Sequence, residues 1–226
     1  MPREEYQKAL KTLRADVLGM GDLAASQLAD GLEALETGDE TLARAVIDGD
    51  EALNDRYLDL ESRCVDLLAL QQPVAGDLRF VVASFKISTD LERVGDLATN
   101  LGEYALATGA DPTRPDGIDV AGIGADAESM LSDALVAYER EDVAACHAVA
   151  DRDDDLDALC ASASDRVVRD LIEREAGGDG WAVERLMDDV SRLLLTIRDL
   201  ERVGDHAVNV AARTLYMIES DPELIY

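Results

Sequence analysis

One eleven-residue segment occurs twice in the chain. Asp90–Asn100 reads DLERVGDLATN and Asp199–Asn209 reads DLERVGDHAVN, so the first seven residues return unchanged. The two copies lie 109 positions apart, close to half of the 226-residue chain. A repeat on this scale predicts a duplicated architecture in which each half of the molecule carries one copy.

Acidic and amide side chains recur every four residues within each copy. On an α-helix, positions four apart share one face, so each copy presents two carboxylates and an amide together. An oxygen-rich strip of this kind suits a hard cation. The residues of the two strips are Glu92, Asp96 and Asn100 in the first copy and Glu201, Asp205 and Asn209 in the second.

Apolar residues recur at spacings of three and four in six stretches, which predicts α-helices. Breakers such as Gly38, Pro73 and the run of glycines at 177–180 separate the stretches. The six helices are expected at residues 4–37, 39–70, 77–108, 118–140, 143–176 and 181–219. The pattern predicts an all-α fold of two tandem antiparallel three-helix bundles, related by internal pseudo-symmetry.

The strongest cluster of helix breakers marks the expected domain boundary. It lies in the stretch GADPTRPDGIDVAG, which follows the third helix. We expect a first bundle at residues 1–109, a linker at 110–117 and a second bundle at 118–226.

The positions of the turns place acidic pairs at the same height in each hairpin. In the first half, Asp50 and Asp96 are equidistant from Pro73, as are Asn54 and Glu92. If the right helix faces meet, each hairpin gathers four oxygen-bearing side chains, and these are the candidate metal ligands. The first set is Asp50, Asn54, Glu92 and Asp96; the second is Asp153, Asp157, Glu201 and Asp205, centred on Asp179.

The charge of the chain offers a competing explanation for these acids. With 49 acidic residues against 21 Lys and Arg, the net charge is −28, so acidic pairs also arise by chance. Arg93 and Arg202, which belong to the repeat, can neutralise them by ion pairing instead of a metal. The same charge excludes nucleic acid and anionic membrane as partners, because both are polyanions. With only three lysines, the composition is typical of a salt-adapted protein.

Other features of the sequence favour a cytoplasmic protein. The chain has no apolar run long enough for a membrane span and starts with polar residues, so contact with a membrane is expected only through a partner. Cys64, Cys146 and Cys160 are scattered, as expected for small buried hydrophobes in a reducing compartment. His206, present in one copy of the repeat only, is expected to be exposed or to cap a helix.

These motifs together resemble the PhoU family. The resemblance rests on the doubled E-R-V-G-D with a following Asn, on an Asp followed four residues later by Asn or Asp in the preceding helix, and on the corner QPVAGDLR at Gln72–Arg79. It covers essentially the whole chain, although the corner has no counterpart near Gly177. Asn54 also stands where an acid would bind metal better, so we expect the first site to be the weaker one.

The resemblance implies a function as well as a fold. It implies a protein, often a homodimer, that represses high-affinity phosphate uptake beside the ATPase subunit of the phosphate ABC transporter and, in bacteria, beside a sensor kinase. It also implies multinuclear metal sites, which in this family hold iron or zinc. The all-oxygen ligand sets themselves favour magnesium, manganese, calcium or ferric iron over zinc.

Two other functions fit a helical protein rich in acids. A carboxylate-bridged metalloenzyme would need Glu-x-x-His motifs, and the sequence has none and only two histidines. No Ser, Cys or Lys lies in a recognisable catalytic setting. A helical adaptor that binds no metal is the third reading. The sequence favours a non-enzymatic regulator.

Overall fold

The computed structural model describes residues 3–71, 73, 75–108, 118–175, 180–220 and 222–225, and it describes only the backbone at 3, 71, 174, 175 and 180–185. This part of the chain is almost entirely helical, in agreement with the expected all-α fold. The helices are α1 (Arg3–Thr37), α2 (Glu40–Gln71), α3 (Ala75–Thr108), α4 (Val120–Arg140), α5 (Val143–Ala150), α6 (Asp153–Glu175) and α7 (Gly180–Glu219).

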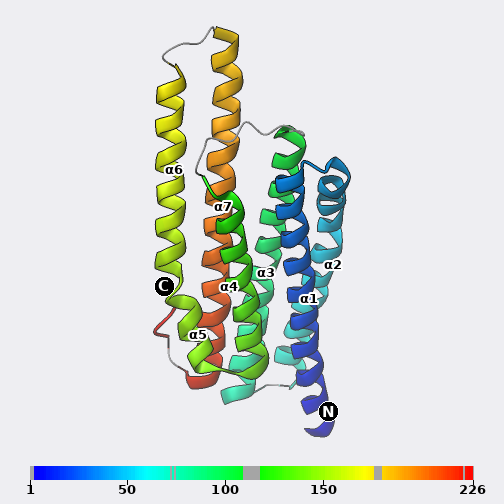
Figure 1. Ribbon diagram of the computed structural model, residues 1–226. Helices are drawn as coiled ribbons and strands as arrows, with labels where there is room; N and C mark the ends of the chain where they lie inside the picture. The colour runs from blue at the N-terminus through cyan, green and yellow to red at the C-terminus, as the bar shows by residue number, and fades with distance from the viewer. Residues whose placement is uncertain are drawn as a thin grey trace.

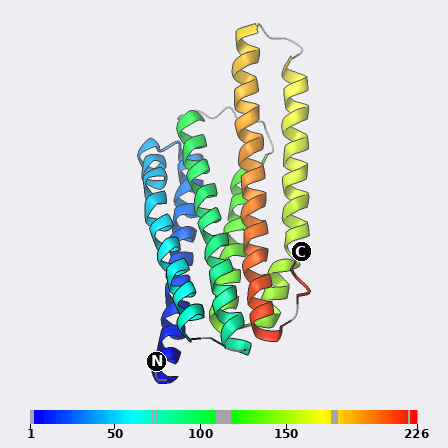
Figure 2. The ribbon, with the colours of Figure 1, turned by 180° about the vertical axis from the view of Figure 1, so that it is seen from behind.

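The helices lie side by side as one elongated bundle (Figures 1 and 2). α1, α2 and α3 pack together in the first half, and α4, α6 and α7 with the short α5 in the second. The halves join where α3 packs antiparallel to α7 and α1 packs against α4. One hydrophobic core runs through both, from Leu13 and Leu28 to Ile197 and Leu215. The two expected bundles therefore share a core.

Local chemistry accounts for the helix ends. Gly38 has φ 68°, which ends α1 at little steric cost, and Asp39 Oδ1 accepts from the backbone N–H groups of Thr41 and Leu42 at the start of α2. Glu141 has φ 54° and ends α4, and Asp142 caps α5 through Ala145 N. The turns expected at both places are present.

The helix expected at 143–176 is divided in two. A turn at Asp151 and Arg152 separates α5 from α6, and Asp153 is the first residue of α6. Arg152 fastens the turn to α4 by binding Asp133 at 2.8 Å. A helix that begins here places the acidic residues 153–155 in its first turn, where the helix dipole favours negative charge. The turn therefore positions a candidate ligand.

The glycines of the repeat allow close packing of the two hairpins. A Cβ at Gly95 would overlap the side chain of Leu53 on α2, and a Cβ at Gly204 would overlap that of Leu156 on α6. Both leucines are buried and occupy equivalent positions in the two halves. These contacts bring α2 against α3 and α6 against α7, with the faces that carry the acids turned toward each other.

Several expectations fall partly or wholly outside the described residues. The linker at 110–117 and the turn at 177–179 are among them. The third helix, expected to begin at residue 77, begins at Ala75, which places Asp77 in its first turn. No helix in the described ranges is both long and apolar enough to cross a membrane.

Candidate metal centre

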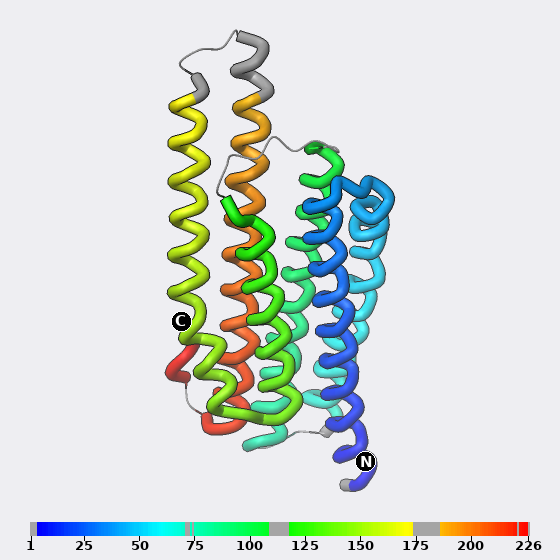
Figure 3. Tube along the Cα trace, in the orientation of Figure 1, coloured from blue at the N-terminus to red at the C-terminus, as the bar shows by residue number. Residues whose placement is uncertain are grey.

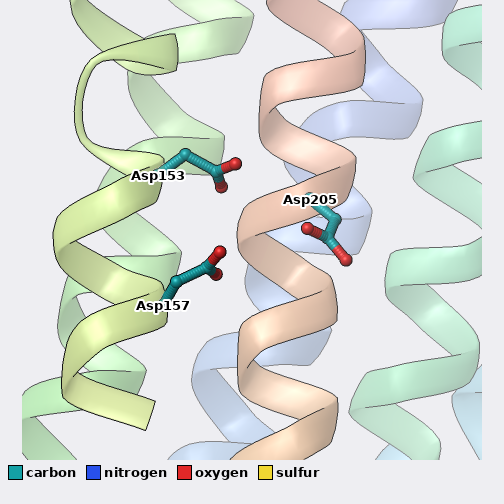
Figure 4. A group of neighbouring side chains, drawn as sticks. All are labelled: Asp153, Asp157 and Asp205. Atoms are coloured by element: carbon teal, nitrogen blue, oxygen red, sulfur yellow. The ribbon is translucent and has the colours of Figure 1, made fainter. Parts of the chain in front are cut away.

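Three acidic side chains meet between α6 and α7. Asp153 and Asp157 extend from α6 toward α7, which carries Asp205 (Figure 4). One carboxylate oxygen from each lies within 4.8 Å of the others, so the three can hold one cation. In the described part of the chain, this is the one such group of acids, Cys and His. It contains three of the four residues predicted for the second set.

Glu201, the fourth residue predicted for this set, lies at its edge. The charges of Asp157 and Asp205 contribute to raising the pKa of Glu201, after burial as the larger cause, so the three carboxylates are electrostatic neighbours. Glu201 is outside the group whose oxygens lie within 4.8 Å of one another. Its place one turn from Asp205 on α7 makes it a neighbour of the cluster.

The electrostatics of this cluster favour a cation. Burial raises the pKa of Asp153 from 3.8 to about 6, and the charges of Asp157, Asp205, Asp154 and Glu201 add to the effect. The pKa of Asp205 is also raised, by burial first and then by Asp157. Ionising these groups together is costly because like charges repel at short range. A bound cation would reverse that cost.

The donor atoms fit a hard metal ion. Asp153 Oδ1 is buried and has no hydrogen-bond partner, which leaves a lone pair free for a ligand. All the donors are carboxylate oxygens, the atoms preferred by Mg²⁺, Mn²⁺ and ferric iron. Cys160 is fully buried nearby, but burial raises the pKa of its thiol to about 12, with Glu201 the next cause. It stays protonated at neutral pH and serves as a small apolar residue.

The first predicted set is gathered more loosely. Asp50 contributes to raising the pKa of both Glu92 and Asp96, behind burial in each case, so α2 and α3 do bring these acids near each other. Asn54 Nδ2 donates to Asp50 Oδ2 at 2.9 Å, and Thr99 Oγ1 lies 3.4 Å from Asp50 Oδ1. The amide therefore occupies one oxygen of Asp50 instead of offering a fourth negative charge.

The arginines of the repeat partly offset the negative charge near both sets, but they form no ion pair with the predicted ligands in the described part of the chain. Arg93 and Arg202 both oppose the rise in the pKa of Asp96, and Arg202 opposes that of Asp205. The ion pair formed by Arg202 is to Asp199, at 3.6 Å, and not to Asp205. In the described part of the chain, ion pairing with Arg93 or Arg202 does not neutralise the clustered acids.

The first residue of each repeat copy has a role that the sequence analysis missed. Asp199 is fully buried, and its Oδ2 accepts from Asn100 Nδ2 at 3.1 Å and from Tyr104 OH at 2.9 Å. On the other side, Asp90 Oδ1 lies 3.2 Å from Asn209 Nδ2. Each copy thus binds the other across the α3–α7 contact.

Two expectations about polar residues are corrected by this arrangement. Asn100 and Asn209 are not part of the acidic strips, because their amides turn toward the aspartate of the other copy. His206 is neither exposed nor a helix cap: it is buried, and its Nδ1 lies 2.9 Å from Asp90 Oδ1. A signal for these contacts was present, because Asp90 falls in register with the apolar residues Val94 and Leu97.

Comparison with known proteins identifies relatives over nearly the whole chain. The model of the PhoU domain matches it twice, at residues 17–105 and 120–214. The chain is 37% identical over 209 residues to a phosphate-specific transport system accessory protein PhoU homolog of Caulobacter vibrioides, covering 92% of this chain and 87% of that protein. It is 33% identical over 219 residues to a homolog of the same description from Methanothermobacter thermautotrophicus, covering 96% and 95%.

Solved structures show the same fold. The crystal structure of PhoU from Pseudomonas aeruginosa superposes with a TM-score of 0.85 at 30% identity, covering 96% of this chain and all of that one. The phosphate transport system regulatory protein PhoU from Streptococcus pneumoniae gives a TM-score of 0.84 at 25% identity, covering 96% and 98%.

Proposed function

The chain belongs to the PhoU family, and from this premise we propose that it is a regulator of phosphate uptake that acts by contact with a phosphate transporter. Its relatives are named as accessory or regulatory proteins of phosphate transport systems, and a non-enzymatic role of this kind is the one proposed for the chain. The observation that carries the proposal is the match of both halves to the PhoU domain. The finer proposal is that it represses uptake by binding the ATPase subunit of the phosphate ABC transporter, and that a sensor kinase is a second partner where one is present.

A bound metal ion is the second part of the proposal. Asp153, Asp157 and Asp205 would hold it between α6 and α7, with Glu201 beside them. The ion would neutralise the repulsion described above and fasten the two helices together. The looser set of Asp50, Asn54, Glu92 and Asp96 would bind more weakly, because Asn54 brings no charge. The oxygen donors favour manganese, magnesium or iron over zinc.

The regulatory part is tested in the native host. Deletion of the gene should raise phosphate uptake in phosphate-replete cells, and the wild-type gene should restore repression. The tagged protein should retain the transporter ATPase subunit from replete cells and less of it from starved cells. Unchanged uptake after deletion, together with no retained ATPase subunit, would refute the proposal.

The metal is tested on purified protein. After chelator treatment, Mn²⁺ should raise the melting temperature of the wild type and have a much smaller effect on Asp157→Asn and Asp205→Asn. Asp154→Asn is the matched control, since Asp154 is exposed on α6 outside the cluster. Equal shifts in all variants, with no metal found by elemental analysis, would leave a helical adaptor without metal as the better description.

A further inference from the structure

A pocket lies at the end of the molecule where α1 and α3 begin. Its volume is about 400 Å³, within the range of sites that take small organic molecules. Four parts of the fold meet around it: the starts of α1 and α3, the turn between α4 and α5, and the end of α7 (Figure 3). Met217, near the end of α7, lines the pocket twelve residues beyond Asp205, which is about 18 Å along a helix. The pocket is therefore separate from the metal centre.

The pocket gathers positive charge in a strongly negative protein. Among the described residues, Lys11, Arg14 and Arg79 line it together with the acids Asp77 and Glu141, so the formal charge of this described lining is +1, while the chain carries −28. An anion that the rest of the surface repels can bind here at short range, because salt screens the distant charges.

Arg14 forms a wall of the pocket, and its guanidinium is already paired within the protein. Its guanidinium lies 5.0 Å from the centre of the Phe80 ring and 5.5 Å from that of Tyr138. It also pairs with the carboxylate of Glu141 and donates to the carbonyl of Tyr138 at 3.4 Å. Glu141 is thereby neutralised, and Lys11 and Arg79 are left to bind a ligand, with the carboxylate of Asp77 as the one opposing charge among the described lining residues.

Arg79 carries a donor that no described residue uses. Its Nε is buried and has no hydrogen-bond partner in the described part of the chain. Within the described residues, neither Arg79 nor Lys11 forms an ion pair, although acids outnumber bases more than two to one. A buried, unsatisfied N–H costs free energy, which a bound acceptor would recover.

The first turn of α3 adds a third source of positive potential. Gly76 and Asp77 belong to this turn and line the pocket. The first N–H groups of a helix have no partner within the helix, and the helix dipole favours an anion beside them. A tetrahedral dianion can meet an ammonium, a guanidinium N–H and helix N–H groups together, whereas a planar carboxylate has only two oxygens.

We propose that this pocket binds a small organic phosphate. The phosphate oxygens accept from Lys11, from Arg79 Nε and from the N–H groups at the start of α3. The organic part packs against the apolar side of the pocket, formed by Leu10, Phe80 and Met217. The volume and this apolar wall favour a phosphate ester over free phosphate.

Isothermal titration calorimetry on the full chain tests the proposal with phenyl phosphate as the probe. Inorganic phosphate and benzoate are titrated at the same ionic strength. Phenyl phosphate should bind at least about tenfold more tightly than either of them, because only it carries both the dianion and the apolar part.

Three variants locate the binding. Lys11→Ala and Arg79→Ala should each weaken phenyl phosphate by about tenfold. Gly76→Glu should abolish binding by placing a carboxylate in the pocket, and it should fold normally because a Cβ at Gly76 meets no atom within 4 Å. Lys8→Ala is the matched control, since Lys8 lies one turn from Lys11 on α1 and outside the pocket.

Each contrary result overturns a stated part of the proposal. If phenyl phosphate does not bind the wild type, or binds Gly76→Glu as tightly, the pocket is not the site. If inorganic phosphate binds as tightly, the ligand is not an organic phosphate, and equal binding of benzoate excludes phosphate specificity. None of these results bears on the metal or on the transporter.

Discussion

At the residue scale, Asp153 shows most directly how the fold prepares the proposed cation site. It is the first residue of α6, and its Oδ1 is buried without a partner in the described part of the chain, while four other carboxylates lie near. Its raised pKa means that ionisation of this residue opposes folding until a cation binds. The same side chain is thus unfavourable in the metal-free protein and useful in the metal-bound one.

Asp153→Asn should therefore have opposite effects without and with metal. Because the folded pKa of about 6 exceeds 3.8, the folded state holds the proton more tightly, and stability falls as the pH rises from 3.8 to about 6. At higher pH the metal-free variant should melt about 2–4 °C above the wild type, a difference that disappears toward pH ~4. With Mn²⁺ the order should reverse. A variant that melts below the wild type at every pH without metal would contradict this account.

Asn54→Asp should strengthen the first predicted set. The change replaces the donor to Asp50 Oδ2 with a fourth carboxylate. Without metal, the variant should lose about 1 kcal/mol of stability through the lost hydrogen bond and added repulsion. With Mn²⁺, elemental analysis should find additional bound metal. An unchanged metal content would show that these side chains do not converge on one ion.

At the element scale, each hairpin depends on close contact between its two helices. Gly95 on α3 accommodates Leu53 of α2, and Gly204 on α7 accommodates Leu156 of α6. Glycine lowers helix stability by about 1 kcal/mol relative to alanine, so its presence in long helices needs a reason. The reason here is a leucine in the space that a Cβ would take.

Gly95→Ala should destabilise the protein despite the gain in helix propensity. If Leu53 cannot move aside, overpacking lowers the stability by about 1–3 kcal/mol. This loss exceeds the gain in helix propensity of about 1 kcal/mol. Gly76→Ala in the same helix is the control and should be neutral or stabilising, since its Cβ would meet open space. Chemical denaturation measures both. Equal stability of the two variants would show that Leu53 relaxes freely.

At the scale of the whole molecule, the halves are joined by polar contacts within an apolar interface. Asp199 on α7 accepts from Asn100 and Tyr104 on α3, and Asp90 on α3 contacts His206 and Asn209 on α7. Burial, followed by the hydrogen bond to Asp199, raises the pKa of Tyr104 to about 12, so its hydroxyl remains a donor. The two copies of the repeat therefore specify how the halves meet.

Asp199→Ala should weaken this contact strongly. The change leaves Asn100 and Tyr104 without their acceptor, at a cost of about 2–4 kcal/mol in the free energy of unfolding. Asp188→Ala, at an exposed position of α7, should be within about 0.5 kcal/mol of the wild type. If the two variants unfold at the same denaturant concentration, the buried aspartate does not stabilise the contact between the halves.

The net charge of −28 predicts a strong dependence of stability on salt. Repulsion among the acids weakens when counterions screen them, so the melting temperature should rise from ~0.1 M to ~2 M KCl. Sucrose at matched viscosity controls for general solvent effects. A flat melting temperature would mean that salt adaptation is absent.

Much of this architecture follows from the sequence because helices and duplications leave local signals. The spacing of apolar residues predicted the helices, and Gly38 and Asp39 marked a turn that is present. The repeat placed Asp153, Asp157 and Asp205 at one height. The break before Asp153 was missed because Asp151 and Arg152 are not helix breakers; contacts of Arg152 with α4 hold the turn.

The sequence by itself determined the all-α fold, the two related halves and which acids share one helix face at the same height in each hairpin, because spacing along a helix decides which side chains share a face. Only the tertiary structure decided that the halves share one core, that Asp90 and Asp199 each contact the other half, and that three basic side chains line one pocket. These features join residues far apart in the chain, and no local pattern records which distant surfaces will pack together.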